Sequence, residues 1–200
     1  SATLVKAVEE LLTEAGVGPG LPLAALDAIV VTSGPGSFTG VRVGLSAAKG
    51  LAEAAGLPVA AVSRLAALAA KAGTELAALD AHRHEIFLRL SAGGETRELL
   101  AGAAALAALG APQGAIAVCE DAAAELLREA WPGAELKRVE APTAADALRL
   151  AAGRVAAGQF DDVALLDGHY LRRSDAEIFG EAGQIRPIGG GRGGDGQDRA

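Results

Sequence analysis

Several residue types are scarce in this chain of 200 residues, and each shortage excludes a class of protein. The only cysteine is Cys119, which excludes an intramolecular disulfide and a cysteine-based zinc cluster and agrees with a reducing compartment. Aromatic residues make up 3% of the chain, so the core must be built from Ala, Leu, Val and Ile. We therefore expect a globular, cytoplasmic protein without aromatic stacking platforms.

Positive charge and long apolar runs are also scarce. The formal net charge is −7, and only four lysines are present. The chain therefore lacks the basic face that holds a phosphate backbone, and any nucleic-acid contact should pass through a partner. No apolar stretch approaches the roughly 20 residues of a membrane span, and no secretory leader is recognisable. The chain contains no methionine and opens at Ser1 inside a helical pattern, which fits either methionine removal or a truncated N-terminus.

The first part of the chain, residues 1–78, has the pattern of a parallel α/β lobe. An amphipathic helix is predicted from apolar residues at helical spacing, which are Leu4, Val5, Val8, Leu11 and Leu12. Short β-branched or apolar runs predict strands at 26–32 and 59–62. Helices are predicted from Ser37 or Phe38 to Ala55 and from Ser63 to about Lys71. This alternation indicates parallel strands with right-handed crossovers.

A second lobe is predicted over residues 79–188. We expect a junction at 73–78, then one long strand from Leu79 to Leu90 with Ile86, Leu88 and Leu90 on one face. Further strands are predicted at 96–100 and 115–119, and helices at 121–130 and 143–158, the last capped by Thr143 and Asp146. Residues 189–200 are rich in glycine and poor in apolar groups, which predicts a disordered tail.

A glycine-rich loop from Gly34 to Gly40 lies between a predicted strand and a predicted helix. The Walker and dinucleotide-binding patterns both fail here, because no lysine follows the loop and Thr39 stands where the third glycine belongs. Two interpretations stay open. The loop is a tight turn with a helix cap at Ser37 or Thr39, or it contacts an anion or nucleotide through Gly34, Gly36, Ser37 and Thr39.

The helix after this loop carries a face almost without side chains, on which Gly40, Gly44, Ala47, Ala48 and Leu51 recur at spacings of three and four. Such a face allows another element to approach closely, either the chain's own sheet or a second molecule. The amphipathic first helix favours the second molecule. The predicted interface consists of Leu4, Val8, Leu11, Gly40, Val43, Gly44, Ala47, Ala48 and Leu51.

Candidates for catalysis or metal binding are weak. His82 and His84 are predicted on one strand face, but two imidazoles without a third ligand rarely hold a metal. Ser37 lacks the nucleophile-elbow pattern, and Cys119 is expected to be a buried small apolar residue. The pair Asp161 and Asp162 is expected in a turn or at a strand end. We assign no catalytic and no metal-binding residue.

The segments GPGSFTGVRVGL at 34–45 and AKGLA at 48–52 resemble the signature of the bacterial TsaB (YeaZ) family. Further agreement comes from LDAIVV at 26–31, VSRL at 62–65, DAHRHEIF at 80–87 and YLR at 170–172. The resemblance implies the α/β actin-like ATPase fold, also called ribonuclease-H-like, of the Gcp-like superfamily, with two lobes. The family also has some three strands ahead of the helix that opens this chain, so the resemblance implies a first lobe truncated at its N-terminus.

The resemblance also implies a function. TsaB proteins are non-catalytic partners of the TsaD threonylcarbamoyl transferase and act with the TsaE ATPase in making threonylcarbamoyladenosine in tRNA. Helices that match residues 3–15 and 38–54 form the family's dimer interface, with a second copy or with the transferase. No cofactor is implied for the isolated chain, and ATP or ADP with magnesium belongs to the complex.

Two alternative functions and one structural expectation also follow from the sequence. An enzyme of the same superfamily would bind ATP itself between the lobes through the 34–40 loop. RNA binding by the glycine-rich tail has only Arg192 and Arg199 in its favour. The missing strands would leave the strands at 26–31 and 59–62 with exposed apolar faces and edges.

Overall fold

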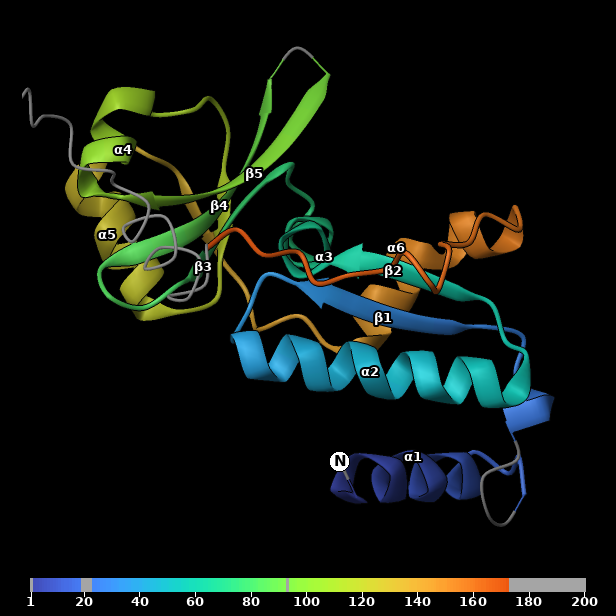
Figure 1. The fold of residues 1–200 in the computed structure, drawn as a ribbon. Coiled ribbons are helices and arrows are strands. Elements are labelled where there is room, and N and C mark those ends of the chain that lie inside the picture. The colour runs from blue at the N-terminus through green and yellow to red at the C-terminus, as the bar shows by residue number, and fades with distance from the viewer. Residues whose placement is uncertain (1, 19–22, 93, 173–200) are drawn as a thin grey trace, which may run out of the picture.

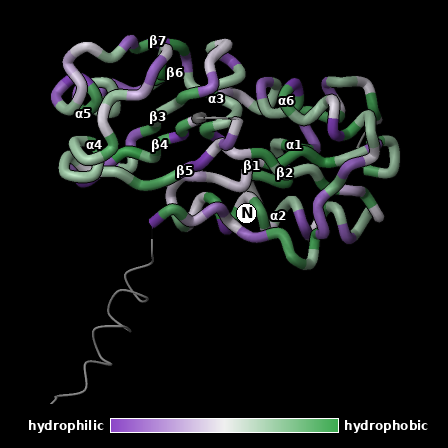
Figure 2. The backbone as a smooth tube through the Cα atoms, turned by 90° about the horizontal axis from the view of Figure 1, so that it is seen from above, coloured by the Kyte–Doolittle hydropathy of each residue, from purple (hydrophilic) through white to green (hydrophobic). Residues whose placement is uncertain are grey.

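The computed structural model describes residues 2–18, 23–92 and 94–172, which fold around two separate β-sheets (Figure 1). The small sheet consists of β1 (Ile29–Gly34) and β2 (Val59–Ser63). The large sheet has the order β5-β4-β3-β6-β7. Seen from above, the two groups of elements lie side by side, with α3 (Arg64–Ala72) between them (Figure 2). This arrangement agrees with the predicted two-lobed α/β fold.

The small sheet is parallel, with Ile29 opposite Val59 and Thr32 opposite Val62. The connection between its strands is α2 (Phe38–Ala55), which lies along the sheet in Figure 1 and packs its inward residues Leu45, Ala48 and Ala52. A second helix, α6 (Ala144–Ala156), returns from much later in the chain to cover Ala60 and Val62. The remaining elements of this region are α1 (Ala2–Glu14) and a short 3-10 helix (Leu23–Ala25).

The large sheet is mixed. It contains β3 (Leu76–Asp80), β4 (Glu85–Ala92), β5 (Glu95–Gly102), β6 (Ile116–Val118) and β7 (Leu136–Arg138). The pairs β3–β4 and β4–β5 are antiparallel, whereas β3–β6 and β6–β7 are parallel. On one face it packs against α4 (Ala103–Leu109) and α5 (Asp121–Ala130), and on the other against α3. The large sheet is thus covered on both faces.

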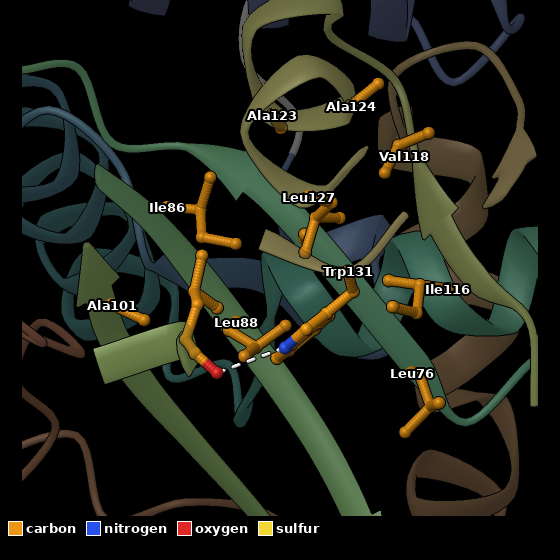
Figure 3. Packing of buried hydrophobic residues seen from close by; sticks show 12 residues of the cluster. Leu76, Ile86, Leu88, Ala101, Ile116, Val118, Ala123, Ala124, Leu127 and Trp131 are labelled. Atoms are coloured by element: carbon orange, nitrogen blue, oxygen red, sulfur yellow. Dashed lines mark hydrogen bonds between the residues drawn. The ribbon is translucent and has the colours of Figure 1, made fainter. Parts of the chain in front are cut away.

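Trp131 completes the core between the large sheet and the helices α4 and α5. Its ring lies among Ile86, Leu88, Ile116 and Leu127 (Figure 3). The indole Nε1–H donates a hydrogen bond of 3.0 Å to the carbonyl oxygen of Leu106, so the one polar atom of the ring is paired inside the core. The prediction of a core made mainly of aliphatic residues is confirmed, with Trp131 and Phe87 as its buried aromatic residues among those described.

The predicted single strand from Leu79 to Leu90 is wrong. The chain forms β3 and β4 there and reverses direction between them at 81–84, so β3 also occupies part of the predicted junction at 73–78. Three consecutive residues, His82, Arg83 and His84, have φ near +58°. The Asp80 carboxylate supports this turn by accepting the backbone N–H of His82 at 2.7 Å. Alternating apolar residues on both sides conceal such a turn in the sequence, because none of the three residues is a glycine.

The helices at 121–130 and 143–158 are confirmed as α5 and α6. Thr143 and Asp146 form the expected capping box at the start of α6. The predicted lobe boundary between residues 78 and 79 falls inside β3, and α6 packs against the small sheet. The predicted tail, residues 189–200, lies outside the described residues.

The expected exposure of the strand at 59–62 is also wrong. Val59 and Ala60 are fully buried, because the segment after α6 runs along the outer edge of β2. The backbone N–H of Asp161 donates to the Val59 carbonyl at 2.8 Å, and the Asp161 carboxylate accepts the N–H of Ala61 at 2.7 Å. Arg154 adds hydrogen bonds to both the Ala61 carbonyl and Asp161. Asp161 therefore closes a sheet edge, whereas β1 keeps half-buried apolar residues.

Candidate functional site

The glycine-rich loop forms the turn and cap that start α2. The Ser37 hydroxyl accepts the N–H of Gly40 at 3.1 Å, which satisfies one of the free amides of the first helical turn. A Cβ at Gly40 would lie 2.6 Å from this hydroxyl oxygen. The glycine at position 40 is therefore required by the cap itself. The capping interpretation of Ser37 is confirmed, while the anion contact of this loop stays a prediction.

The outer surface of α2 is open to solvent in this chain. We define the α2 strip as Gly40, Val43, Gly44, Ala47 and Leu51, which are all exposed or half-buried. A Cβ at Gly44 would meet nothing within 4 Å. Ala48 differs, because its exposure is 7% and its own chain covers it. Ala48 is therefore not available to a partner, which corrects the predicted interface at that position.

The α1 helix presents apolar side chains that the rest of the described chain leaves exposed. Leu11 is 63% exposed, and Leu4 and Val5 are each 40% exposed. Among the described elements α1 packs extensively against none, and it lies below α2 in the view of Figure 1. Monomeric proteins rarely leave a row of large apolar side chains on one helix uncovered. The predicted residues Leu4, Val8 and Leu11 thus lie on a helix that has little contact with its own fold.

A cavity of about 750 Å³ lies between the start of α2, the ends of β3 and β6, and the segment 169–172. Its charged lining residues are Arg42, Arg64, Arg83, Arg172, Asp80 and Glu120. Its aromatic lining residues are Phe38, Phe87 and Tyr170, and His82 and His169 also reach it. We call this space the interlobe cavity, because α2 belongs to the small-sheet group and β3 to the large sheet.

Most charged groups of the interlobe cavity are paired within the chain. Arg64 lies 3.3 Å from Glu120, whose other oxygen accepts the backbone N–H of Asp80 at 2.6 Å. Arg172 pairs with Glu85 and donates to the Ala81 carbonyl at 2.9 Å. These bonds connect the segment at 172 to the turn between β3 and β4.

Arg42 is held by aromatic rings. Its guanidinium carbon lies 3.8 Å from the centre of the Phe38 ring and 5.7 Å from that of Tyr170. The Nε atom donates to the Tyr170 hydroxyl at 3.2 Å, and the two rings are 5.2 Å apart. Cation–π and hydrogen-bond contacts therefore restrict a side chain that would otherwise move freely in solvent.

Glu98 of β5 joins the two groups of elements at a second point. Its side chain is only 7% exposed. The Ser63 hydroxyl at the end of β2 donates to both carboxylate oxygens at 2.7 Å, and Arg89 donates at 2.8 Å. The His169 Nε2 atom lies 3.0 Å from the same carboxylate. One buried carboxylate thus contacts both sheets and the segment 169–172.

The other titratable candidates have structural surroundings. His82 is exposed in the turn at 82–84 and lies 2.9 Å from Asp80, so the predicted arrangement of His82 and His84 on one strand face is wrong. Burial, with the neighbouring Glu120 carboxylate, raises the pKa of the Cys119 thiol, which disfavours the reactive thiolate. Within the described ranges, no group of three or more His, Cys, Asp and Glu side chains is placed to hold a metal. None of the described helices is long and apolar enough to cross a membrane.

Comparison with known proteins connects this architecture to a family. The family model described as "TsaD: tRNA N6-adenosine threonylcarbamoyltransferase" matches residues 1–159. A crystal structure of a Pseudomonas aeruginosa protein described as similar to peptidase YEAZ is 32% identical, with a TM-score of 0.68 over 86% of this chain and 84% of that chain. YeaZ from Pseudomonas aeruginosa gives a TM-score of 0.66 at 32% identity, over 84% of this chain and 82% of that chain. The chain belongs to the TsaB (YeaZ) family.

Curated relatives agree with this family over shorter segments. The tRNA threonylcarbamoyladenosine biosynthesis protein TsaB of Haemophilus influenzae is 42% identical over 86 residues, or 40% of this chain and 35% of that protein. A tRNA N6-adenosine threonylcarbamoyltransferase of Cereibacter sphaeroides is 38% identical over 138 residues, or 68% of this chain and 36% of that protein. The matches thus span about a third of the length of these two relatives. The likeness to TsaB and YeaZ proteins confirms the family resemblance and the actin-like fold class that it implied.

Sequence reasoning missed the residues that join the lobes. Arg42 and Tyr170 stand in recognised segments of this TsaB-family chain, yet they are 128 positions apart and no local pattern pairs them. Glu98 gave no signal either, because a lone glutamate in a strand is normally a solvent-facing residue. These side chains come together only because the elements around the small sheet pack against those around the large sheet.

Proposed function

We propose that this chain is a non-catalytic scaffold subunit of a tRNA threonylcarbamoyladenosine modification complex. It pairs with a TsaD-type transferase, acts with a TsaE-type ATPase, and meets tRNA only through the complex. Membership of the TsaB family supports this role, as does the low positive charge of the chain.

The observation that carries the proposal is the open α2 strip beside the exposed apolar residues of α1. Gly44 has free space where a side chain would stand, so a partner helix can approach the α2 backbone there. Leu4 and Leu11 supply apolar area that gains from burial, because a fully buried leucine is stabilised by about 1.5–3 kcal/mol. Close backbone contact and apolar burial together describe a helix-packing interface.

The partner surface is tested by co-purification of the chain with a TsaD-type transferase. Gly44→Leu should reduce the recovered complex at least tenfold, because the added side chain holds the partner helix away. The same variant should unfold at the wild-type temperature or slightly above it, since nothing lies within 4 Å of the added Cβ and leucine is a better helix former than glycine. Gly40→Ala is unsuitable, because it would disturb the Ser37 cap.

Ser46→Leu is the matched control. Ser46 is exposed on α2, and two residues along a helix correspond to about 200° of rotation, so it points away from Gly44. This control should pair like the wild-type chain. If Gly44→Leu and Ser46→Leu recover equal amounts of the transferase, the α2 strip is not part of the interface.

Leu11→Ser tests the contribution of α1. Leu11 is 63% exposed, so the change should leave the unfolding free energy of the isolated chain within about 0.5 kcal/mol. It should weaken pairing with the transferase, and sedimentation of the free chain shows whether a second copy uses the same surface. Unchanged affinity for the transferase would exclude α1 from the interface.

A further inference from the structure

The interlobe cavity contains unused hydrogen-bond donors on one side. The carboxylates of Asp80 and Glu120 are occupied by His82, Arg64 and backbone amides. Arg172 is occupied by Glu85 and the Ala81 carbonyl. The two carboxylates in the lining thus already have donors, which leaves little negative charge for a cationic ligand to bind.

Arg42 differs from these residues. Its Nε–H donates a hydrogen bond to the Tyr170 hydroxyl. Its two terminal nitrogens have no hydrogen-bond or ion-pair partner among the described residues. The guanidinium is nevertheless fixed over the Phe38 ring at 3.8 Å. A planar fork that is held in place and keeps its outer donors free is suited to a carboxylate or a phosphate, which it can bind with two parallel hydrogen bonds.

The charge of the lining favours an anion as well. Four arginines and two carboxylates line the cavity, and Glu85 beside the lining pairs with Arg172. Positive charge is therefore in slight excess here, in a chain whose formal net charge is −7. Such a local field attracts small anions and repels cations.

Aromatic side chains also line the cavity. Phe38, Phe87 and Tyr170 line the same space, and a volume of about 750 Å³ lies within the range of small-molecule sites, roughly 300–1,000 Å³. Aromatic walls bind planar groups well, and the fixed arginine orients whichever end of the ligand is charged.

From this geometry we propose that the interlobe cavity binds a small organic anion, with its carboxylate or phosphate on Arg42 and a flat ring against the aromatic side chains of the lining. This binding is a property of the chain alone. It goes beyond the scaffold role and requires neither the transferase nor the α2 strip. It also differs from the anion contact predicted from the 34–40 loop, because the decisive group is an arginine one turn into α2.

Isothermal titration of the full chain with four probes tests this site. Phenyl phosphate and benzoate each carry a ring and an anion, inorganic phosphate carries only the anion, and benzyl alcohol carries only the ring. At least one of the first two should bind at least tenfold more tightly than both of the last two. The tighter of phenyl phosphate and benzoate identifies the charged group. Equal binding of inorganic phosphate or of benzyl alcohol would overturn the proposal, as would the absence of binding by all four probes.

Variants of Arg42 connect the binding to this residue. Arg42→Ala should lower the affinity for the tighter ring-bearing probe at least tenfold. Arg42→Lys should recover part of this affinity, because lysine keeps the positive charge but lacks the planar guanidinium. Tyr170→Phe keeps the ring and removes the hydroxyl that positions Nε, so it should cause a smaller loss. Arg97→Ala is the matched control, because Arg97 is exposed on β5 outside the cavity lining.

The readout separates this proposal from the scaffold proposal. If Arg42→Ala no longer binds the ring-bearing probe but still co-purifies with the transferase, the result supports the anion site and does not affect the scaffold proposal. Unchanged affinity of Arg42→Ala for the ring-bearing probe overturns the site, whatever the pairing result. A shift of the Arg42 Nε–H resonance on titration provides a second measurement that depends on direct contact.

Discussion

The small sheet and the large sheet differ in how completely their own chain covers them. The large sheet has α4 and α5 on one face and α3 on the other, and its apolar clusters are almost fully buried. The described large apolar side chains that remain exposed are Leu4, Val5, Leu11, Phe38, Val43, Leu148, Leu165 and Tyr170. None of them belongs to the large sheet or to α3, α4 or α5.

This difference separates two uses of apolar surface. Apolar residues around the large sheet stabilise the fold, because they exclude water within one chain. Apolar residues on α1 and the outer side of α2 contribute little to the isolated fold and are available to another molecule. Substitutions in the two regions should therefore differ in how much they change the stability of the isolated chain.

Leu88→Ala should give the largest loss of stability. Leu88 is fully buried on the large sheet beside Trp131, and truncation there leaves a cavity in a tightly packed core. We expect the unfolding free energy to fall by about 2–5 kcal/mol in urea titrations. Leu11→Ala on α1 is the control and should change it by less than about 0.5 kcal/mol. Similar losses in both variants would abolish the distinction between the two regions.

Glu98→Gln tests whether the two regions are joined through one buried carboxylate. The change keeps the side-chain size but leaves Arg89 without its charged partner and weakens the bond from Ser63. We expect a loss of about 3 kcal/mol in the unfolding free energy, typical of a broken buried ion pair. Glu95→Gln, exposed on the same strand, should have almost no effect. A loss below about 1 kcal/mol would mean that Glu98 is not a significant connection.

Thr143→Ala tests the cap that positions α6 against the small sheet. The Thr143 hydroxyl accepts the N–H of Asp146, so its removal frees an amide at the helix start. We expect a loss of about 1 kcal/mol in the unfolding free energy. Thr143→Ser keeps the hydroxyl and should retain most of the stability. Equal losses in the two variants would assign the effect to the threonine methyl group.

The pH dependence of Asp146 should give the smallest effect. Hydrogen bonds from the Thr143 backbone and hydroxyl, and then from Lys71 of α3, hold the pKa of Asp146 well below its ordinary value of 3.8. A folded-state pKa below the unfolded one stabilises the fold above pH 3.8, and this stabilisation is lost progressively as the pH falls towards the folded-state pKa.

Thermal unfolding of the wild-type chain and of Asp146→Asn measures this contribution. The wild type should unfold at a higher temperature at neutral pH, and the gap should narrow as the pH drops below 3.8. A gap that stays constant down to pH 2 would show that the ionised carboxylate is not responsible.

The parts of the fold that were predictable depend on local interactions. The cap of α2 by Ser37, the capping box of α6 and the span of α5 involve residues within a few positions of one another, so their pattern is visible in the sequence. The turn at His82, Arg83 and His84 was missed because it contains no glycine, although the Asp80 carboxylate stabilises it locally.

The candidate sites, too, contain features that local sequence predicts and features that depend on tertiary packing. The α2 strip could be predicted, because helical spacing alone places Gly40, Gly44 and Ala47 on one face. The burial of Ala48 could not, because it depends on how far the sheet extends beneath the helix. The interlobe cavity was only partly foreseeable, since its loop was recognised and its arginine was not.

Sequence alone was enough to predict α1, α2, α3, α5 and α6, the caps of α2 and α6, the small-residue face and the family to which the chain belongs, because hydrogen bonds and periodicity within a few residues carry that information. The tertiary structure alone decided that Arg42 meets Tyr170, that Ser63 meets Glu98 and that Asp161 closes β2. Contacts over 35 to 128 positions depend on how two sheets and their helices stack, and the short-range chemistry of the chain does not specify that stacking.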